Sequence, residues 1–163
     1  MVPFYLLSIA PIGVGWLFIR WLLANNRGPK HPRSALILAG CLGLVATPIA
    51  IILEGKFLSP KLLTDPAGLT VGQLLLNTLL IGVIEEGAKS LPLATFLYKK
   101  GYFHVVTDGV IYFSISGMIF GIIEDIGYTA SLGPGAGIAK ILTGPFSHAA
   151  FASLFGWTVA RRK

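Results

Sequence analysis

The chain has 163 residues, of which 54% are hydrophobic and only 12% are charged, and its mean hydropathy is +0.76. A soluble domain carries about twice that fraction of charge, so the composition excludes an ordinary soluble fold. The net charge of +6 does not indicate a nucleic-acid partner, because the basic residues cluster in short segments between long apolar runs. We expect one all-α domain over residues 1–163, embedded in the lipid bilayer and binding no nucleic acid.

Apolar runs of about twenty residues, the length that crosses a bilayer, predict a polytopic bundle of five transmembrane helices. The first lacks a basic leading region and a small-residue cleavage site, so we expect a retained helix and not a signal peptide. A mixed-charge loop is expected at 54–68, and a break at Gly144-Pro145 in the fifth helix. The predicted helices cover residues 3–24, 34–53, 69–98, 107–130 and 138–160.

The charged loops also predict an orientation. Basic clusters occur at 27–33, at 99–100 and at 161–163, which five crossings would place on the same side of the membrane. Basic loops are typical of the cytoplasmic side. We therefore expect the N-terminus outside and the C-terminus in the cytoplasm.

The third predicted helix carries three charges within five residues: Glu85, Glu86 and Lys89. One such charge at the centre of a membrane helix costs about 2.5–3.5 kcal/mol on insertion scales. Lys89 follows the two acids by four and three residues, so it can pair with either. Adjacent residues point about 100° apart around a helix, so the two acids cannot both face straight into one cavity.

Each of two later predicted helices carries a polar side chain on a face of small residues. Glu124 shares a helix face with Gly117 and Gly121, a spacing that lets a neighbouring backbone approach closely. His148 shares a face with Gly144. We predict that these two residues and the acids of the third helix meet in one polar cavity.

Each feature also has a purely structural interpretation. The Glu–Lys pairs could lock helices together, and a lone histidine such as His148 is often a hydrogen-bonded core residue. Asp125 is expected at the membrane interface, and Asp108, or its neighbour Thr107, as an N-terminal helix cap. The acids outnumber the lysine, however, which leaves an excess of negative charge in a medium of low dielectric constant. Protonation, water or a bound metal must relieve that excess.

In order, the motifs Glu85-Glu86-x-x-Lys89, Phe120-x-x-x-Glu124 and His148 with Phe151 resemble the PrsW family of intramembrane proteases. Asp108-Gly109-x-x-Tyr112 and Gly127-Tyr128 are also similar to that family. The resemblance covers about residues 80–156 and extends distantly to the CAAX prenyl endopeptidases. Asp125 stands where the family often has asparagine.

The resemblance implies glutamic-type or metal-dependent hydrolysis of a peptide bond in or near the membrane segment of a membrane-anchored protein, in a prokaryotic inner or plasma membrane. A membrane-embedded glutamate can act as general base on water, and His148 can donate to the oxyanion or to the leaving amine. We assign the base to Glu85 or Glu86, and the second carboxylate to Glu124. Supporting roles fall to Lys89, Asp108 and Asp125.

Two alternatives stay open. Glu86, Glu124 and His148 could instead bind a divalent metal such as zinc, for which carboxylate and imidazole are suitable ligands. The sequence has no HExxH motif, so we expect no cofactor and rank the metal second. A non-catalytic scaffold or a small proton-coupled transporter could use the same acids as polar contacts or as a proton path.

Overall fold

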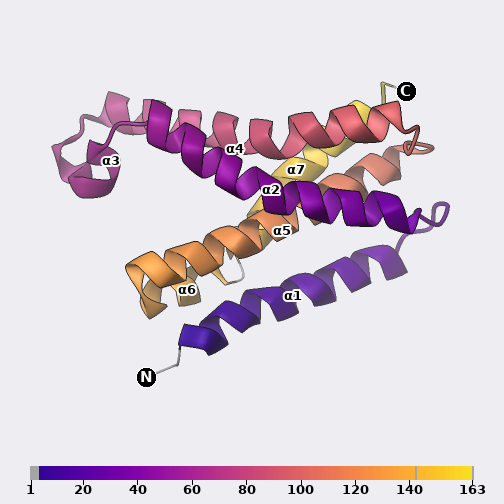
Figure 1. Cartoon of the computed structure of the whole chain (residues 1–163), viewed down its shortest axis with the longest axis horizontal. Coiled ribbons are helices and arrows are strands. Elements are labelled where there is room, and N and C mark those ends of the chain that lie inside the picture. Colours follow the sequence, from indigo (N-terminus) through magenta and orange to yellow (C-terminus); the bar gives the residue numbers. More distant parts are fainter. Residues whose placement is uncertain (1–3, 142, 163) are drawn as a thin grey trace.

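The computed structural model describes residues 4–141 and 143–162, and within these residues it contains helices and no strand. Three short helical segments lie in the connections: α3 (Lys61–Thr64), η1 (Pro66–Gly68) and α6 (Pro134–Lys140). The predicted all-α fold is confirmed. The long helices form an elongated bundle (Figure 1) and are α1 (Phe4–Ala24), α2 (Arg33–Phe57), α4 (Val71–Lys99), α5 (Val106–Leu132) and α7 (Thr143–Ala160).

Several helix ends differ from the prediction. α2 runs four residues past the expected end, so Glu54 belongs to a helix and not to the following loop. The fifth predicted helix is divided into α6 and α7, but the expected break at Gly144-Pro145 is wrong, because α6 ends at Lys140 and both residues lie within α7. Pro145 is in the first turn of α7, where a proline is tolerated because its missing N–H would have had no partner there. Pro3, the predicted start of the first helix, and Leu142 lie outside the described residues.

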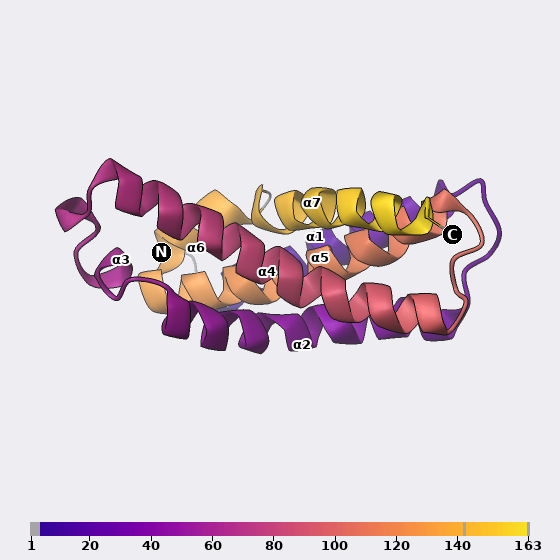
Figure 2. The same cartoon turned by 90° about the horizontal axis from the view of Figure 1, so that it is seen from above.

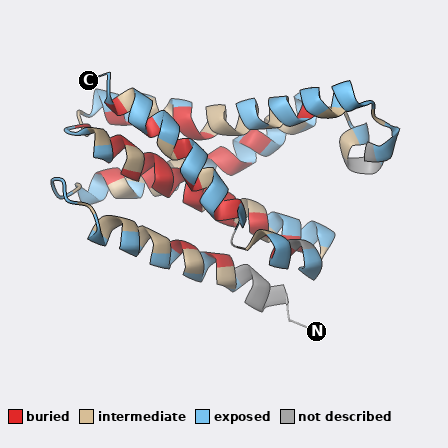
Figure 3. Ribbon diagram, turned by 180° about the vertical axis from the view of Figure 1, so that it is seen from behind, coloured by how far each residue is buried: buried red, intermediate tan, exposed pale blue. Residues whose placement is uncertain are grey.

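The outer surface of the bundle is apolar. Helices α2, α4 and α5 are each long and apolar enough to cross a membrane, and α1 contributes a shorter apolar stretch over residues 9–24. Figure 3 shows exposed residues along the outward faces of these helices. Large apolar side chains at such positions include Ile37, Ile52, Leu75, Leu79 and Leu91. A surface of this kind suits lipid and not water, so the chain is an integral membrane protein.

The basic segments gather at one end of the bundle. The α1–α2 loop, the α4–α5 turn and the C-terminus lie together, whereas α3 and α6 lie at the opposite end (Figures 1 and 2). This arrangement is the one that alternating crossings predict. Which end faces the cytoplasm stays a prediction, and Lys163 of the last basic cluster lies outside the described residues.

Helix α5 is the most buried of the long apolar helices, and its glycines bring α7 close to it. A Cβ atom added at Gly109 would collide with the carbonyl of Gly156, and one at Gly117 would collide with the backbone of His148. A Cβ atom at Gly121 would lie 2.7 Å from the Cα atom of Pro145. The absent side chains therefore allow the backbone contact that sets His148 beside α5.

Candidate active site

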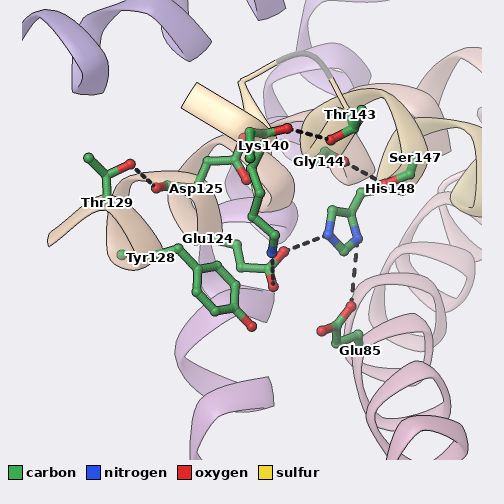
Figure 4. Close-up of polar contacts among 12 residues, drawn as sticks. Glu85, Glu124, Asp125, Tyr128, Thr129, Lys140, Thr143, Gly144, Ser147 and His148 are labelled. Carbon is green, nitrogen blue, oxygen red and sulfur yellow. Dashed lines mark hydrogen bonds and ion pairs between the residues drawn. The ribbon is translucent and has the colours of Figure 1, made fainter. Parts of the chain in front are cut away.

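His148 forms the centre of a polar cluster between α4, α5 and α7. Its Nε2 atom lies 2.6 Å from Oε2 of Glu124, and its Nδ1 atom lies 2.8 Å from Nζ of Lys89. Oε2 of Glu85 is 3.6 Å from Nδ1, so the ring lies between two carboxylates (Figure 4). A lysine ammonium can only donate, which makes Nδ1 the acceptor and leaves the Nε2 proton to Glu124.

Lys89 is fully buried, with 0% of its surface exposed. Its Nζ atom lies 2.6 Å from Oε1 of Glu86 and 3.9 Å from Oε2 of Glu85, and 4.3 Å from the ring centre of Phe120. A buried ammonium is tolerated only when such partners replace water. The spacing of the first motif thus places one cation against two acids of its own helix and against His148 of α7.

The structure brings together five of the residues singled out from the sequence, and their catalytic roles stay predictions. The five are Glu85, Glu86, Lys89, Glu124 and His148. The expectation that the two adjacent acids cannot both face one cavity is wrong, because Glu85 and Glu86 both line a groove between α4 and α7. Glu86 takes the short contact to Lys89, whereas Glu85 is left nearer to His148.

Asp125 does not join this cluster. The expectation that it lies at the membrane interface is wrong, because it is fully buried and a Cβ atom at Gly144 of α7 would collide with its carboxylate. Neither carboxylate oxygen has a hydrogen-bond partner among the described residues. Asp125 therefore belongs to the contact between α5 and α7. It follows Glu124 directly in the sequence, but its side chain does not face the cluster.

Asp108 lies far from the cluster, about 24 Å along α5 from Glu124 at 1.5 Å per residue. The expected N-cap at Thr107 or Asp108 is wrong, because Val105 is the N-cap of α5. Asp108 lies at the third helical position, where its Oδ2 atom accepts the N–H groups of His104 and Val105 over 2.7 and 2.9 Å. Its Oδ1 atom lies 3.1 Å from Nδ1 of His31. Burial lowers the pKa of His31, and the nearby Asp108 opposes that shift.

Sequence reasoning missed two residues of the site. Nζ of Lys140, on α6, lies 3.6 Å from Oε1 of Glu124 and 3.5 Å from the ring centre of Tyr128. Lys140 is the only lysine or arginine between Asp125 and Arg161, which could have marked it. Glu54 was missed because the predicted helix ended one residue before it.

Two hollows meet at Glu85. A groove of about 740 Å³ lies between α4 and α7, and its lining includes Glu85, Glu86 and His148. A second pocket of about 380 Å³ lies between α2 and α5, and its polar lining includes Glu54, Glu124 and Tyr128. Glu85 lines both hollows, so it can face the groove on one side and, on the other, a pocket that holds the further carboxylates of Glu54 and Glu124.

The donor groups do not fit a metal ion as they lie here. The predicted alternative placed a metal between Glu86, Glu124 and His148, but both ring nitrogens of His148 are taken by Lys89 and Glu124. Lys89 also occupies the contact to Glu86. Among the described residues, no group of three or more histidine, cysteine, aspartate or glutamate side chains lies close enough to hold a metal.

Fold and site together define a helical integral membrane protein with a carboxylate, lysine and histidine cluster between its helices. The family described as "PrsW family intramembrane metalloprotease" matches residues 31–163, and the chain belongs to this family. It is 27% identical over 163 residues to "Protease PrsW" of Clostridioides difficile (strain 630), covering 98% of this chain. The chain spans 66% of the length of that relative. No solved structure matches it.

Proposed function

We propose that this protein is an intramembrane endopeptidase in which Glu85 activates water against a peptide bond of a membrane-anchored protein. The observation that carries the proposal is the position of Glu85 in the lining of both hollows. The apolar groove suits a membrane-embedded peptide, and the carboxylates of Glu54 and Glu124 in the second pocket can hold water beside Glu85. Membership of a family described as proteases supports the same reaction class and favours it over a scaffold or a transporter.

The proposed reaction uses Glu85 as general base. As the water oxygen bonds to the carbonyl carbon, Glu85 takes one proton, and it returns that proton to the leaving nitrogen when the C–N bond breaks. The second water proton stays with the new carboxyl group. Glu86 is less suited to this role, because its Oε1 atom is held 2.6 Å from the ammonium of Lys89.

His148 is proposed to stabilise the oxyanion by turning its Nε2–H from Glu124 to the oxyanion, with Glu124 as the partner that orients the ring before the substrate binds. The 2.6 Å contact between Nε2 and Glu124 fixes the ring beside the groove, and Lys89 holds the other nitrogen. A positioned donor of this type contributes about 10²–10³ in rate. No step of this scheme passes through a metal, and the absence of a cofactor stays a prediction.

The place of the cut follows from the depth of the site. Glu85 lies about 21 Å along α4 from Lys99, and so at the middle of α4, whereas Glu124 lies about 27 Å along α5 from Val106, beyond the middle of α5, at 1.5 Å per residue. If the basic end is cytoplasmic, the scissile bond lies within the substrate's membrane segment or just outside it, on the extracytoplasmic side. The proposed location is a prokaryotic inner or plasma membrane.

The test uses the full chain in vesicles with a single-pass reporter that carries a tag at each end. Glu85→Gln is expected to abolish cleavage without lowering the unfolding temperature, and His148→Ala to slow cleavage by about 10²–10³. Asp65→Asn, which changes an exposed acid outside the site, is the matched control. Full activity of both site variants would refute the proposal, and a cut mapped by mass spectrometry to the cytoplasmic flank would refute the placement.

A further inference from the structure

The groove between α4 and α7 extends well beyond the catalytic cluster. On α4 its lining repeats at every fourth position, through Thr78, Gly82, Glu86, Ser90 and Ala94. From Thr78 to Ala94 this row is about 24 Å long, at 1.5 Å per residue. The hydrocarbon core of a bilayer is about 30 Å thick, so the groove follows most of a membrane-spanning segment.

Two polar atoms in this lining lack a partner. Ser90 is only 4% exposed, and neither its Oγ atom nor Oε2 of Glu86 has a hydrogen-bond partner among the described residues. Leaving such groups unpaired in an apolar setting costs free energy. A lipid acyl chain cannot satisfy them, whereas the N–H and C=O groups of a locally unwound peptide can.

The groove also offers open space beside the glycines of α4 that line it. A Cβ atom added at Gly82 would meet nothing within 4 Å, and one at Gly87 would meet only the tip of Leu91 at 4.0 Å. The glycines of α5 that face α7 are different, because the α7 backbone already fills the space beside them. Small residues with open space beside them allow close approach of another helix backbone.

We propose that the α4/α7 groove is the docking site for the substrate's membrane segment, which lies along α4 with its unwound backbone against Ser90 and Glu86. The proposal rests on the proposed function, because it identifies the occupant as the substrate. Glu86 lies midway along the row, and Glu85 and His148 line the groove beside it, so a segment seated in the groove lies against the catalytic groups. Gly82 then accepts a large apolar side chain of the substrate.

Photo-crosslinking tests the docking site without requiring cleavage. The probe is a synthetic peptide of twenty leucine and alanine residues flanked by lysine pairs, in phosphatidylcholine vesicles with the full chain carrying Glu85→Gln. A photoreactive benzophenone residue replaces Gly82, or replaces Gly72 as a control at an open position of α4 outside the groove. We expect peptide adducts at position 82 and lipid adducts at position 72. Lipid adducts alone at position 82, or equal peptide adducts at both, would overturn the proposal.

Substitutions that fill the groove provide a second measurement. Gly82→Leu is expected to lower cleavage of the single-pass reporter by roughly tenfold or more, an effect of the size that overpacking causes, while Gly72→Leu retains it. Equal cleavage by both variants refutes the docking site and leaves the protease intact. The opposite outcome would be specific peptide adducts at position 82 while a chain that keeps Glu85 and Gly82 cleaves no reporter. The docking site would then stand, and the proposed protease function would fail.

Discussion

Nζ of Lys89 donates to Nδ1 of His148 over 2.8 Å, although the two residues are 59 positions apart in the chain. This contact ties the first sequence motif on α4 to α7. It also determines which nitrogen of the ring carries the proton, and so leaves Nε2–H for Glu124. Lys89 is therefore a positioning residue that acts through Glu86 and His148, and it is too deeply buried to touch a substrate.

Replacing this cation should damage both stability and activity. Lys89→Met leaves the partly buried Glu86 without its partner, and breaking a buried ion pair by removing one member costs at most about 3–5 kcal/mol. It also frees Nδ1 of His148, so the ring can adopt the other tautomer. We expect a lower unfolding temperature in detergent and a large loss of reporter cleavage.

The double variant Lys89→Met with Glu86→Gln separates the two effects. Removing the unpaired charge should restore most of the unfolding temperature. Cleavage should stay low, because His148 still lacks its partner on Nδ1. Recovery of both properties together would show that Lys89 serves stability alone.

The sequence located this cluster because charges in a membrane helix are costly and so stand out. Helical spacing wrongly separated Glu85 from Glu86, since the groove between α4 and α7 is wide enough for both to line it. It could not show that Lys89 reaches α7, since that contact depends on how closely α5 and α7 approach. Glu54 and Lys140 were missed for a related reason, because small errors in where a helix ends decide whether a charged residue faces the bundle or the solvent.

The close approach of α5 and α7 can be tested at Gly117. A single added methyl group would collide with the backbone of His148, so Gly117→Ala should push α7 outwards. We expect a loss of about 1–3 kcal/mol, as for other overpacked contacts, and reduced cleavage although Glu124 and His148 are both present. The unfolding temperature and the cleavage rate are the measurements.

The matched control is Gly40→Ala on α2. A Cβ atom there would meet nothing within 4 Å, and alanine is favoured over glycine within a helix by about 1 kcal/mol. This variant should be as stable as the wild type or more so, and should keep its activity. Equal effects of the two substitutions would contradict the packing argument.

His31 should make the stability of the basic end dependent on pH. Its ring contacts Asp108 and the hydroxyl of Tyr112 on α5, and Asn26 within its own loop. Burial lowers its pKa from 6.5, so below that pH the unfolded chain binds a proton more readily than the folded chain does. The stability that His31 contributes is therefore fully present above pH 6.5 and is lost as the pH falls through the lower, folded pKa.

We expect the difference in unfolding temperature between the wild type and His31→Gln to be largest near pH 8 and to shrink towards pH 5. Taking the difference between the two unfolding temperatures at each pH removes the effect of other groups that titrate in the same range, because both proteins carry them. His104→Gln, at an exposed histidine in the α4–α5 turn, is the control for the substitution itself. A constant difference across this range would mean that His31 does not titrate between the two states.

The last prediction concerns metal. Because Lys89 and Glu124 occupy both nitrogens of His148, a zinc ion could bind there only by displacing one of them. We therefore expect a chelator such as 1,10-phenanthroline to leave cleavage and the unfolding temperature nearly unchanged, and elemental analysis to find well under one zinc per chain. The decisive comparison is the zinc content of wild type, Glu124→Gln and Asp65→Asn. Stoichiometric zinc that falls only in Glu124→Gln, with activity lost on chelation and restored by zinc, would show that Lys89 gives way to a metal in the working enzyme, and Glu85 would then have to act on a metal-bound water.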